Sequence, residues 1–304
     1  MRGSMENNLE SAESGKERHS FQSVLDTDVM YHYCSLEAFM GIITSKCLWM
    51  TSAAYTNDAL EMNSINKCVQ KVLENIYKHR DISFEEFKKK GEWYENNEKA
   101  SMPFICCFSE NLNNFSQWRL YADDCQGVAI AFNMAKLRDR LGIVDNPNIL
   151  EEGYSGDWVH YISKDKEAEL QSKIENEIEK YDVFCVNDII RYVQNFFFKM
   201  DWFKDEKEIR IIYTPGCHLN DESKGYEYNC SLYNKEKFGI RAFGKNLIPY
   251  WKMPLNESDA YEDLAIDKVI VGSKVSDDTK FAIEMFLKKN KLNVSVEKFE
   301  TSYR

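Results

Sequence analysis

The sequence predicts an α+β fold in which mixed or antiparallel sheets are flanked by helices. Short runs of β-branched and aromatic residues recur along the chain, and helical periodicity separates some of these runs but not others. This order lacks the strict alternation of strand and helix that a doubly wound parallel sheet requires. The 304 residues are 43% hydrophobic and 29% charged, as in ordinary globular proteins. Because no repeat or Pro/Gly/Ser-rich linker is visible, residues 29–304 are expected to form a single domain.

The expected strands are short apolar or alternating runs bounded by turn residues. The run 104–108 is apolar throughout and is expected to be buried, whereas Glu208 opens an alternating run that continues to Tyr213. In chain order, the expected strands are 29–33, 48–52, 104–108, 128–132, 158–162, 208–213, 239–243, 247–252, 268–272 and 294–299.

Helices are expected where apolar residues repeat at helical spacing behind a side chain that can cap the first turn. A Glu three residues after such a side chain strengthens the prediction, because the two can satisfy each other's backbone N–H groups. The expected helices run to about residue 45 behind Ser35, to about residue 79 behind Asp58 with Glu61, and to about residue 288 behind Asp277 or Asp278.

Three further segments complete the expected layout. Residues 1–28 are mostly polar, with a vector-like leader before a second methionine at Met5, and are expected to be a disordered tail. Helical periodicity, first charged and then apolar, predicts a helical insertion at about 163–200. The Gly, Asn, Ser and Lys content of about 215–237 predicts a mobile loop.

Composition narrows the class of protein. The net charge of −11 gives an acidic surface, which disfavours generic nucleic-acid binding. No apolar run approaches the roughly 18 residues of a membrane span, and no secretory signal is present. The nine cysteines are odd in number, form no C-x-x-C pair and lie partly in apolar runs, as buried free thiols of a reducing compartment do. A cytoplasmic protein without a membrane partner is therefore expected.

Familiar catalytic motifs are missing from the sequence. The glycine loops of nucleotide-binding folds, the zinc-protease helix motif and the hydrolase nucleophile elbow do not occur. The five histidines are scattered without the spacing of metal ligands. No metal is expected on these grounds.

Polar side chains nevertheless gather in two early segments. His32 lies between two tyrosines, one of them Tyr33, at the centre of the first expected strand. Asn57 and Asp58 follow the second expected strand in a turn. A histidine satisfied within the core would explain the first segment, and turn formation with helix capping would explain the second. Lining of a binding site is the alternative for both.

A third polar segment follows the buried run 104–108. It brings Ser116, Gln117, Trp118 and Tyr121 into a short stretch of chain. Aromatic faces mixed with hydrogen-bonding groups suit a small-molecule pocket. A helical turn that Trp118 anchors in the core is the alternative interpretation.

The fourth segment carries charge in an alternating pattern. Glu206, Glu208 and Arg210 are two residues apart, so on a strand they share one face. They could form a surface ladder of ion pairs. If the face lines a pocket, a carboxylate could instead hold a ribose hydroxyl or stabilise a developing cation.

As an ordered set, these segments resemble a prokaryotic protein family, the domain of unknown function 2971. The resemblance runs from about residue 30 to the end of the chain, and the family name implies no activity. The segments that carry it are 31–33, 48–51, 57–58 with Glu61, 107–110, 116–118 with Tyr121 and Gly127, 204–210, 269–272 and 302–304.

The layout is also similar, more distantly, to the ADP-ribosyltransferase superfamily, whose members bind NAD in a cleft between two small antiparallel sheets. The similarity implies a split version of the α+β fold. It places His32 at the first-strand position, Thr51 or Ser52 at the second, and Glu208 or Glu206 at the catalytic glutamate. The first-strand histidine and the E-x-E pair belong to different subclasses of that superfamily, and the Ser-Gln-Trp segment has no clear counterpart there.

This similarity implies NAD-dependent ADP-ribosyl transfer or NAD glycohydrolysis, as in a bacterial toxin or antiphage-defence effector. Glu208, with Glu206 as the alternative, would stabilise positive charge on the ribose, and Trp118 or Tyr121 would stack on a ring of NAD. NAD would be a substrate, and the macromolecular acceptor is unknown. The residues expected around the nucleotide are His32, Tyr33, Thr51, Ser52, Asn57, Asp58, Ser116, Gln117, Trp118, Tyr121 and Arg210.

Besides a purely structural partner protein, two other classes of function stay open at this point. One is a nucleotide-sensing binding module without chemistry, which would bind a ligand without turnover. The other is a metal-dependent phosphodiester hydrolase that uses Asp58, Glu61, Glu206 and Glu208. The acidic net charge and the lack of a basic stripe count against a nuclease.

Overall fold

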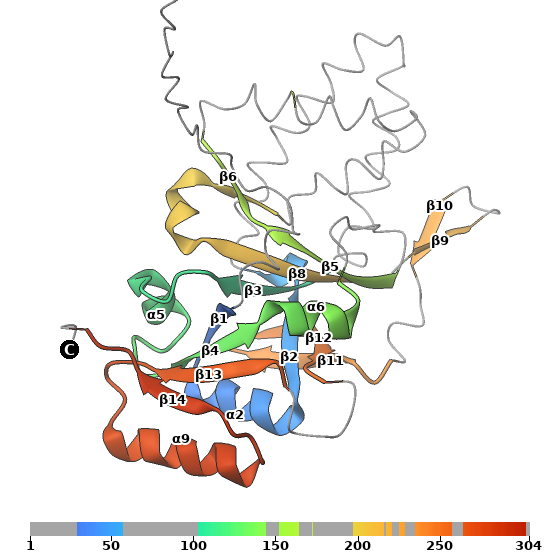
Figure 1. Cartoon of the computed structure of the whole chain (residues 1–304). Coiled ribbons are helices and arrows are strands. Elements are labelled where there is room, and N and C mark those ends of the chain that lie inside the picture. The colour runs from blue at the N-terminus through green and yellow to red at the C-terminus, as the bar shows by residue number, and fades with distance from the viewer. Residues whose placement is uncertain are drawn as a thin grey trace, which may run out of the picture.

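A computed structural model describes residues 29–56, 103–143, 152–163, 172, 197–215, 217–220, 225–228, 235–256 and 264–301. In this part of the chain the fold is α+β, as predicted, with a large sheet that carries a few helices (Figure 1). The expected tail 1–28, the helix expected behind Asp58 and most of the expected insertion 163–200 lie outside the described residues.

The main sheet has ten strands, and all of its pairings are antiparallel except the last. Its central path runs in the order β11-β12-β2-β3-β1-β4-β13-β14, and β8 and β5 branch from β3. The strands are β1 (Val29–Cys34), β2 (Cys47–Ser52), β3 (Phe104–Ser109), β4 (Val128–Asn133), β5 (Glu152–Trp158), β8 (Glu208–Pro215), β11 (Phe238–Phe243), β12 (Asn246–Pro254), β13 (Ile266–Val271) and β14 (Ser295–Lys298).

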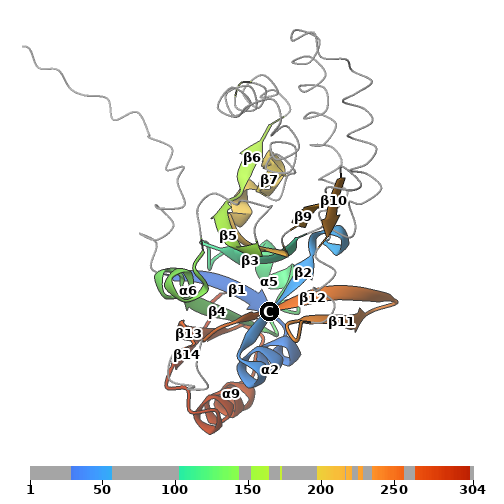
Figure 2. The same cartoon turned by 90° about the vertical axis from the view of Figure 1, so that its right-hand side faces the viewer.

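Strand β3 is the point at which the sheet forks. One of its edges pairs with β8 along the whole strand, from Phe104 opposite Tyr213 to Ser109 opposite Glu208. The other edge pairs with β2 at Phe104 and Ile105, and with β1 only at Ser109. Strands β1 and β2 therefore diverge along the middle of β3, and Figure 2 shows the β11–β12 and β13–β14 ends of the sheet on opposite sides.

Two helices lie together on one side of the sheet (Figures 1 and 2). The first, α2 (Leu36–Ser45), begins where predicted, because the Ser35 hydroxyl accepts a hydrogen bond from the N–H of Ala38 at 3.1 Å. It buries the expected apolar face. The second, α9 (Asp277–Lys289), is capped by Ser276, one residue before the predicted Asp277.

Two shorter helices begin at asparagines. The Asn114 side chain caps α5 (Phe115–Leu120), and the Asn133 side chain caps α6 (Met134–Leu141). Helix α6 directly follows β4, and its apolar residues Met134 and Leu137 are buried in the main core. The sequence-based prediction ended the strand at residue 132 and placed no helix after it.

Some elements differ from the sequence-based expectation. Strand β5 was not expected, and the predicted strand 158–162 is divided between the end of β5 and β6 (His160–Ile162). β6 pairs in parallel with β7 (Phe198–Met200), which lies at the end of the segment expected to be helical. Within the expected loop 215–237 the structure places a hairpin, β9 (Cys217–Asn220) and β10 (Gly225–Tyr228).

The reason for the unexpected β5 is tertiary pairing. Its sequence contains two glycines and an aspartate, which disfavour strands in isolation. All of β5 pairs with β8, from Glu152 opposite Pro215 to Trp158 opposite Ile209. Tyr154 packs against Tyr213, and its hydroxyl accepts a hydrogen bond from Trp251. Partners far away in the sequence thus override the local preference.

Cys34, Cys47, Cys106, Cys107 and Cys125 are free thiols, and Cys34, Cys106 and Cys125 among them are buried. No helix in the described ranges is long and apolar enough to cross a bilayer.

A tight turn joins α5 to β4 and packs against the end of β13. Asp123, Asp124 and Cys125 all adopt left-handed φ angles, of 46°, 53° and 67°. The Cys125 carbonyl accepts a hydrogen bond from the N–H of Lys274 at 3.1 Å. The backbone of Gly272 lies so close that a Cβ there would overlap this carbonyl group. The turn and the strand end fit together only because residue 272 has no side chain.

We therefore expect Gly272→Ala to lower the free energy of unfolding by about 2 kcal/mol or more, since backbone atoms must move to admit the methyl group. Gly41→Ala is the matched control, because nothing lies within 4 Å of a Cβ at that helical position. It should raise stability by about 0.5–1 kcal/mol through helix propensity. Urea denaturation of both variants measures the two effects, and equal stabilities for the two would contradict the packing argument.

Candidate functional site

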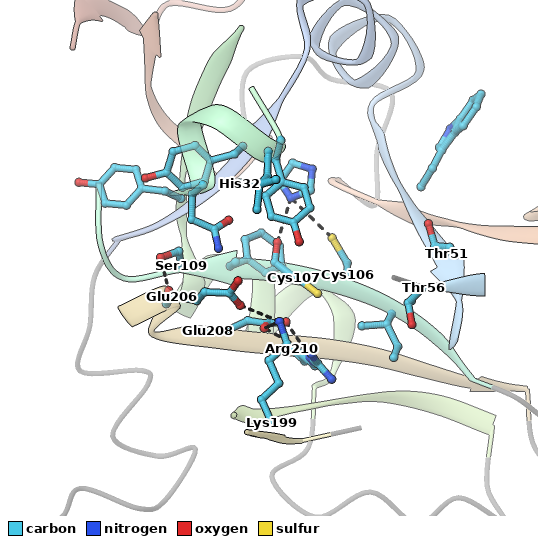
Figure 3. Close-up of a pocket in the computed structure, with 18 of the residues that line it drawn as sticks. His32, Thr51, Thr56, Cys106, Cys107, Ser109, Lys199, Glu206, Glu208 and Arg210 are labelled. Carbon is cyan, nitrogen blue, oxygen red and sulfur yellow. Dashed lines mark hydrogen bonds and ion pairs between the residues drawn. The ribbon is translucent and has the colours of Figure 1, made fainter. Parts of the chain in front are cut away.

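A pocket of about 370 Å³ opens where β1 and β2 diverge from β3 (Figure 3). Its walls come from β1, β2, β3, α5, β7, β8, β11 and β12, together with η4 (Asp201–Glu206) and η1 (Ala53–Tyr55). The volume lies in the range of roughly 300–1,000 Å³ that is usual for small-molecule sites. The fork of the sheet thus creates a pocket large enough to hold a small molecule.

One side of the pocket is a buried cluster of two cations and two carboxylates. The Nζ atom of Lys199 lies 2.6 Å from Oε2 of Glu206 and 2.9 Å from Oε2 of Glu208. The Nε of Arg210 donates to Oε1 of Glu208 at 2.6 Å, and its Nη2 donates to Oε2 at 3.3 Å. All four side chains are buried. Their charges balance, so the cluster is neutral as a whole.

The backbone around Glu206 and Glu208 explains how both side chains reach the pocket. Glu206 ends a 3-10 helix, Lys207 adopts a left-handed φ of 43°, and Glu208 opens β8, where the predicted strand begins. The Ser109 hydroxyl donates to the Glu206 carbonyl at 2.5 Å, and the Glu208 N–H donates to the Tyr161 hydroxyl at 3.0 Å. The segment is therefore fixed to the end of β3 on one side and to β6 on the other.

Glu208 stays ionised in this environment. Burial alone would raise the pKa of its carboxyl group, but the charges of Arg210 and Lys199, with hydrogen bonds from Arg210 and Cys107, outweigh burial and hold the pKa at about 2. The ordinary value is 4.5. Glu208 is thus a fixed anion that accepts hydrogen bonds and is a poor proton acceptor at neutral pH.

His32 lies on β1, next to the middle of β3, where the edge of β3 that faces β1 and β2 has no strand partner. Its Nδ1 is 3.0 Å from the carbonyl oxygen of Cys107, and burial lowers the pKa of its ring. The ring is therefore neutral at physiological pH. Because a carbonyl can only accept, Nδ1 carries the proton and Nε2 is left as an acceptor.

Two adjacent cysteines line the pocket beside His32. Burial raises the pKa of the Cys106 thiol to about 12, and burial with the nearby Glu208 charge raises the pKa of the Cys107 thiol well above its ordinary value. Cys107 is nonetheless solvent-exposed, since it faces the hollow of the pocket. Both thiols are protonated at neutral pH, so neither is activated as a nucleophile.

The opposite side of the pocket is built by β2, β12 and β11. Thr51 pairs with Tyr250, and Ile248, two residues before Tyr250, pairs with Arg241, so these side chains share one face. Trp49 stacks on Tyr250, with ring centroids 4.3 Å apart and planes 15° from parallel. This face presents an aromatic stack, a hydroxyl and a guanidinium to the pocket.

The structure brings most of the predicted site residues together, although they lie far apart in the sequence. Ser52 is buried but does not line the pocket, and Ser116 is exposed outside it. Asn57 and Asp58 lie outside the described residues. The predicted residues that line the pocket are His32, Tyr33, Thr51, Gln117, Tyr121, Glu206, Glu208 and Arg210.

The structure corrects the sequence-based prediction for Trp118. Trp118 or Tyr121 was expected to stack on a ring of NAD, but Trp118 is completely buried outside the pocket and stacks on Phe299 at 4.9 Å, as in the alternative interpretation of a core anchor. Its ring also meets Tyr33 edge-on, and its Nε1 donates to the carbonyl of Leu112 at 2.9 Å. Trp118 therefore anchors α5 in the core, and this anchoring turns Gln117 and Tyr121 toward the pocket.

Sequence reasoning missed several residues that line the pocket, chiefly Lys199, Arg241 and Trp49. Lys199 falls in a segment that was expected to be helical and unrelated to the site. Arg241 and Trp49 lie on expected strands, at alternate positions from which they could have been placed on the same face as Thr51. No motif spacing marks any of the three.

The described residues contain no group of three or more His, Cys, Asp or Glu side chains that could hold a metal ion.

Comparison with known proteins adds a partial family match. Residues 117–211 match the family described as Protein of unknown function (DUF2971), which supports the resemblance drawn from the sequence. No curated protein and no solved structure matches the chain. The matched segment includes Gln117, Tyr121 and all four members of the charged cluster, so the family model covers one whole side of the pocket.

The lowered pKa of Glu208 predicts a pH dependence of stability. A carboxyl group whose pKa is lower in the folded state stabilises the fold above its unfolded pKa, and this stabilisation is lost as the pH falls from about 4.5 toward 2. Between pH 6 and pH 3, we expect the free energy of unfolding of the wild type to fall by about 2 kcal/mol more than that of Glu208→Gln. Glu297→Gln, which removes an exposed carboxylate, should behave like the wild type. Urea unfolding at each pH measures this free energy. If it changes with pH in the same way for the wild type and for Glu208→Gln, the cluster does not hold Glu208 ionised.

Proposed function

We propose that the pocket binds NAD and that the protein breaks the bond between nicotinamide and ribose, passing ADP-ribose to water or to an acceptor. The observation that carries the proposal is the meeting of His32 from β1, Thr51 from β2 and the glutamates Glu206 and Glu208 around one pocket. These are the positions at which the similarity to ADP-ribosyltransferases places the site residues. The free thiols of the described cysteines fit a reducing, NAD-containing cytoplasm.

The reaction requires negative charge close to the ribose. When the C1′–N bond breaks, the electron pair leaves with nicotinamide, and positive charge develops on the ribose carbon and ring oxygen. Glu208 is anionic, buried and held by Arg210 and Lys199, so it provides a fixed negative charge without reorganisation. The incoming nucleophile then bonds to C1′ and loses its proton.

The two glutamates and the histidine take different roles in this proposal. The Glu208 oxygens already accept hydrogen bonds from Arg210 and Lys199, so this residue acts through its charge. Glu206 contacts Lys199 through Oε2 and is the alternative partner for a ribose hydroxyl. His32, neutral with Nε2 as acceptor, can accept a hydrogen bond from another ribose hydroxyl.

One observation favours a second candidate, a nucleotide-sensing module without chemistry. Lys199 and Arg210 balance the charge of the two glutamates, which weakens the field that would stabilise a cation. Such a module would bind NAD or a related nucleotide and leave it intact. For the hydrolase hypothesis, Asp58 and Glu61 lie outside the described residues, and the role as a toxin or defence effector stays a prediction from resemblance.

The proposal is tested by incubating the purified protein with NAD and measuring free nicotinamide by chromatography. We expect Glu208→Gln to release nicotinamide at least about 100-fold more slowly than the wild type, because a neutral amide cannot stabilise the developing charge. Glu206→Gln, measured alongside, distinguishes the roles of the two carboxylates. Glu297→Gln on β14 is the matched control and should retain full activity.

Full activity of a folded Glu208→Gln variant would refute the assigned role of the carboxylate. If the wild type releases no nicotinamide even with cell extract as a source of acceptors, yet binds NAD in calorimetry, the binding module is the correct reading.

A further inference from the structure

Arg241 differs from the other two cations that line the pocket. Lys199 and Arg210 form ion pairs with the glutamates, whereas no carboxylate among the described residues pairs with Arg241. Its Nη2 donates to the Thr51 hydroxyl at 3.1 Å. Its Nε is buried and has no hydrogen-bond partner in the part of the chain that the structure describes. A buried donor left unsatisfied is energetically costly, so this N–H is poised for a group that the described residues do not supply.

Neighbouring side chains fix the position of the guanidinium. Its Cζ lies 5.9 Å from the centroid of the Trp49 ring, and Trp49 stacks in turn on Tyr250. The Tyr250 ring occupies the space over Gly239, where a Cβ would overlap it. Because an aromatic contact and a hydrogen bond already hold it, Arg241 would lose little further freedom when an anion binds.

The pocket is electrostatically divided. Figure 3 shows Thr51 and Thr56 on one side and Glu206 and Glu208 on the other, with Cys106 and Cys107 between them. Arg241 belongs to the threonine side through its hydrogen bond with Thr51. No described carboxylate balances the charge of Arg241, whereas the charged cluster is neutral as a whole, so a ligand with an anionic group at one end and hydroxyl groups at the other would bind in a single orientation.

We propose that Arg241 and Thr51 form a phosphate-binding subsite, which holds the pyrophosphate of a dinucleotide while its nicotinamide riboside lies against Glu206 and Glu208. The identity of the dinucleotide rests on the proposed function; the affinity for phosphate does not. A guanidinium offers paired N–H groups that match two phosphate oxygens at once. The Thr51 hydroxyl, which accepts from Arg241, can donate its proton to a third oxygen.

The test is isothermal titration calorimetry with inorganic pyrophosphate, ADP-ribose and nicotinamide riboside. We expect Arg241→Gln to weaken the binding of pyrophosphate and ADP-ribose about tenfold, and to leave that of nicotinamide riboside unchanged. Arg241→Lys, which keeps the charge but loses the paired geometry, should be intermediate. Lys245→Gln, an exposed cation in the turn between β11 and β12, is the matched control and should bind all three ligands like the wild type.

Measuring the turnover of NAD distinguishes a failure of this subsite from a failure of the proposed function. If NAD is the substrate, Arg241→Gln should raise the KM for NAD about tenfold, and kcat should fall by less. If the wild type does not cleave NAD but binds pyrophosphate in a manner that depends on Arg241, the subsite stands and the proposed function fails. If NAD is cleaved and Arg241→Gln leaves KM unchanged, the function stands and the subsite is refuted.

A structural role for Arg241 would give a different result. In that case Arg241→Gln would weaken nicotinamide riboside and ADP-ribose equally, and thermal unfolding would show a lowered Tm; this outcome overturns the proposal. Failure of the wild type to bind either pyrophosphate or ADP-ribose overturns it as well.

Discussion

Strands β1 and β2 both pair with the same edge of strand β3, and the pocket lies where these two strands diverge. β2 takes the start of the edge and β1 takes its end, so the middle of the strand has no ladder partner there. Backbone polar groups inside a protein are almost always satisfied, and His32 fills this need at the carbonyl of Cys107. The interpretation of His32 as a satisfied histidine is thus compatible with its interpretation as a site residue, since the same hydrogen bond fixes the ring beside the pocket.

The four charged side chains on one side of the pocket are a second constraint on the structure, because each depends on the others for a charged partner. Each of the two cations and two carboxylates is buried, and a single buried charge without a partner is strongly destabilising. The ion pairs also decide the chemistry that is open to Glu208. A carboxyl group with a pKa of about 2 is suited to stabilising positive charge and poorly suited to taking up a proton. The environment of the residue therefore points to an electrostatic role.

Local patterns predicted much of the fold. The Ser35 cap, the apolar face of α2 and the strand that begins at Glu208 depend on neighbours in sequence, and the structure confirms all three, although β8 is buried on both faces. Strand β5 depends on β8 and could not be predicted, because its glycines favour other conformations in isolation. For the site, alternation placed Glu208 and Arg210 on one face, but the direction of the Trp118 ring depends on Phe299, far away in the chain. Nothing in the sequence around Lys199 predicts its ion pairs, because its position depends on the pairing of β7 with β6.

The fork at β3 also sets the order in which the pocket can form. Its three partner strands come from residues 29–34, 47–52 and 208–215, so the contacts that enclose the pocket join segments far apart in sequence. Such pairings close large loops and form slowly. During synthesis, Glu208 and Arg241 leave the ribosome well after β1, β2 and β3. A nascent chain therefore cannot assemble the complete pocket, or show any activity that depends on it, before the segment that carries Arg241 has emerged.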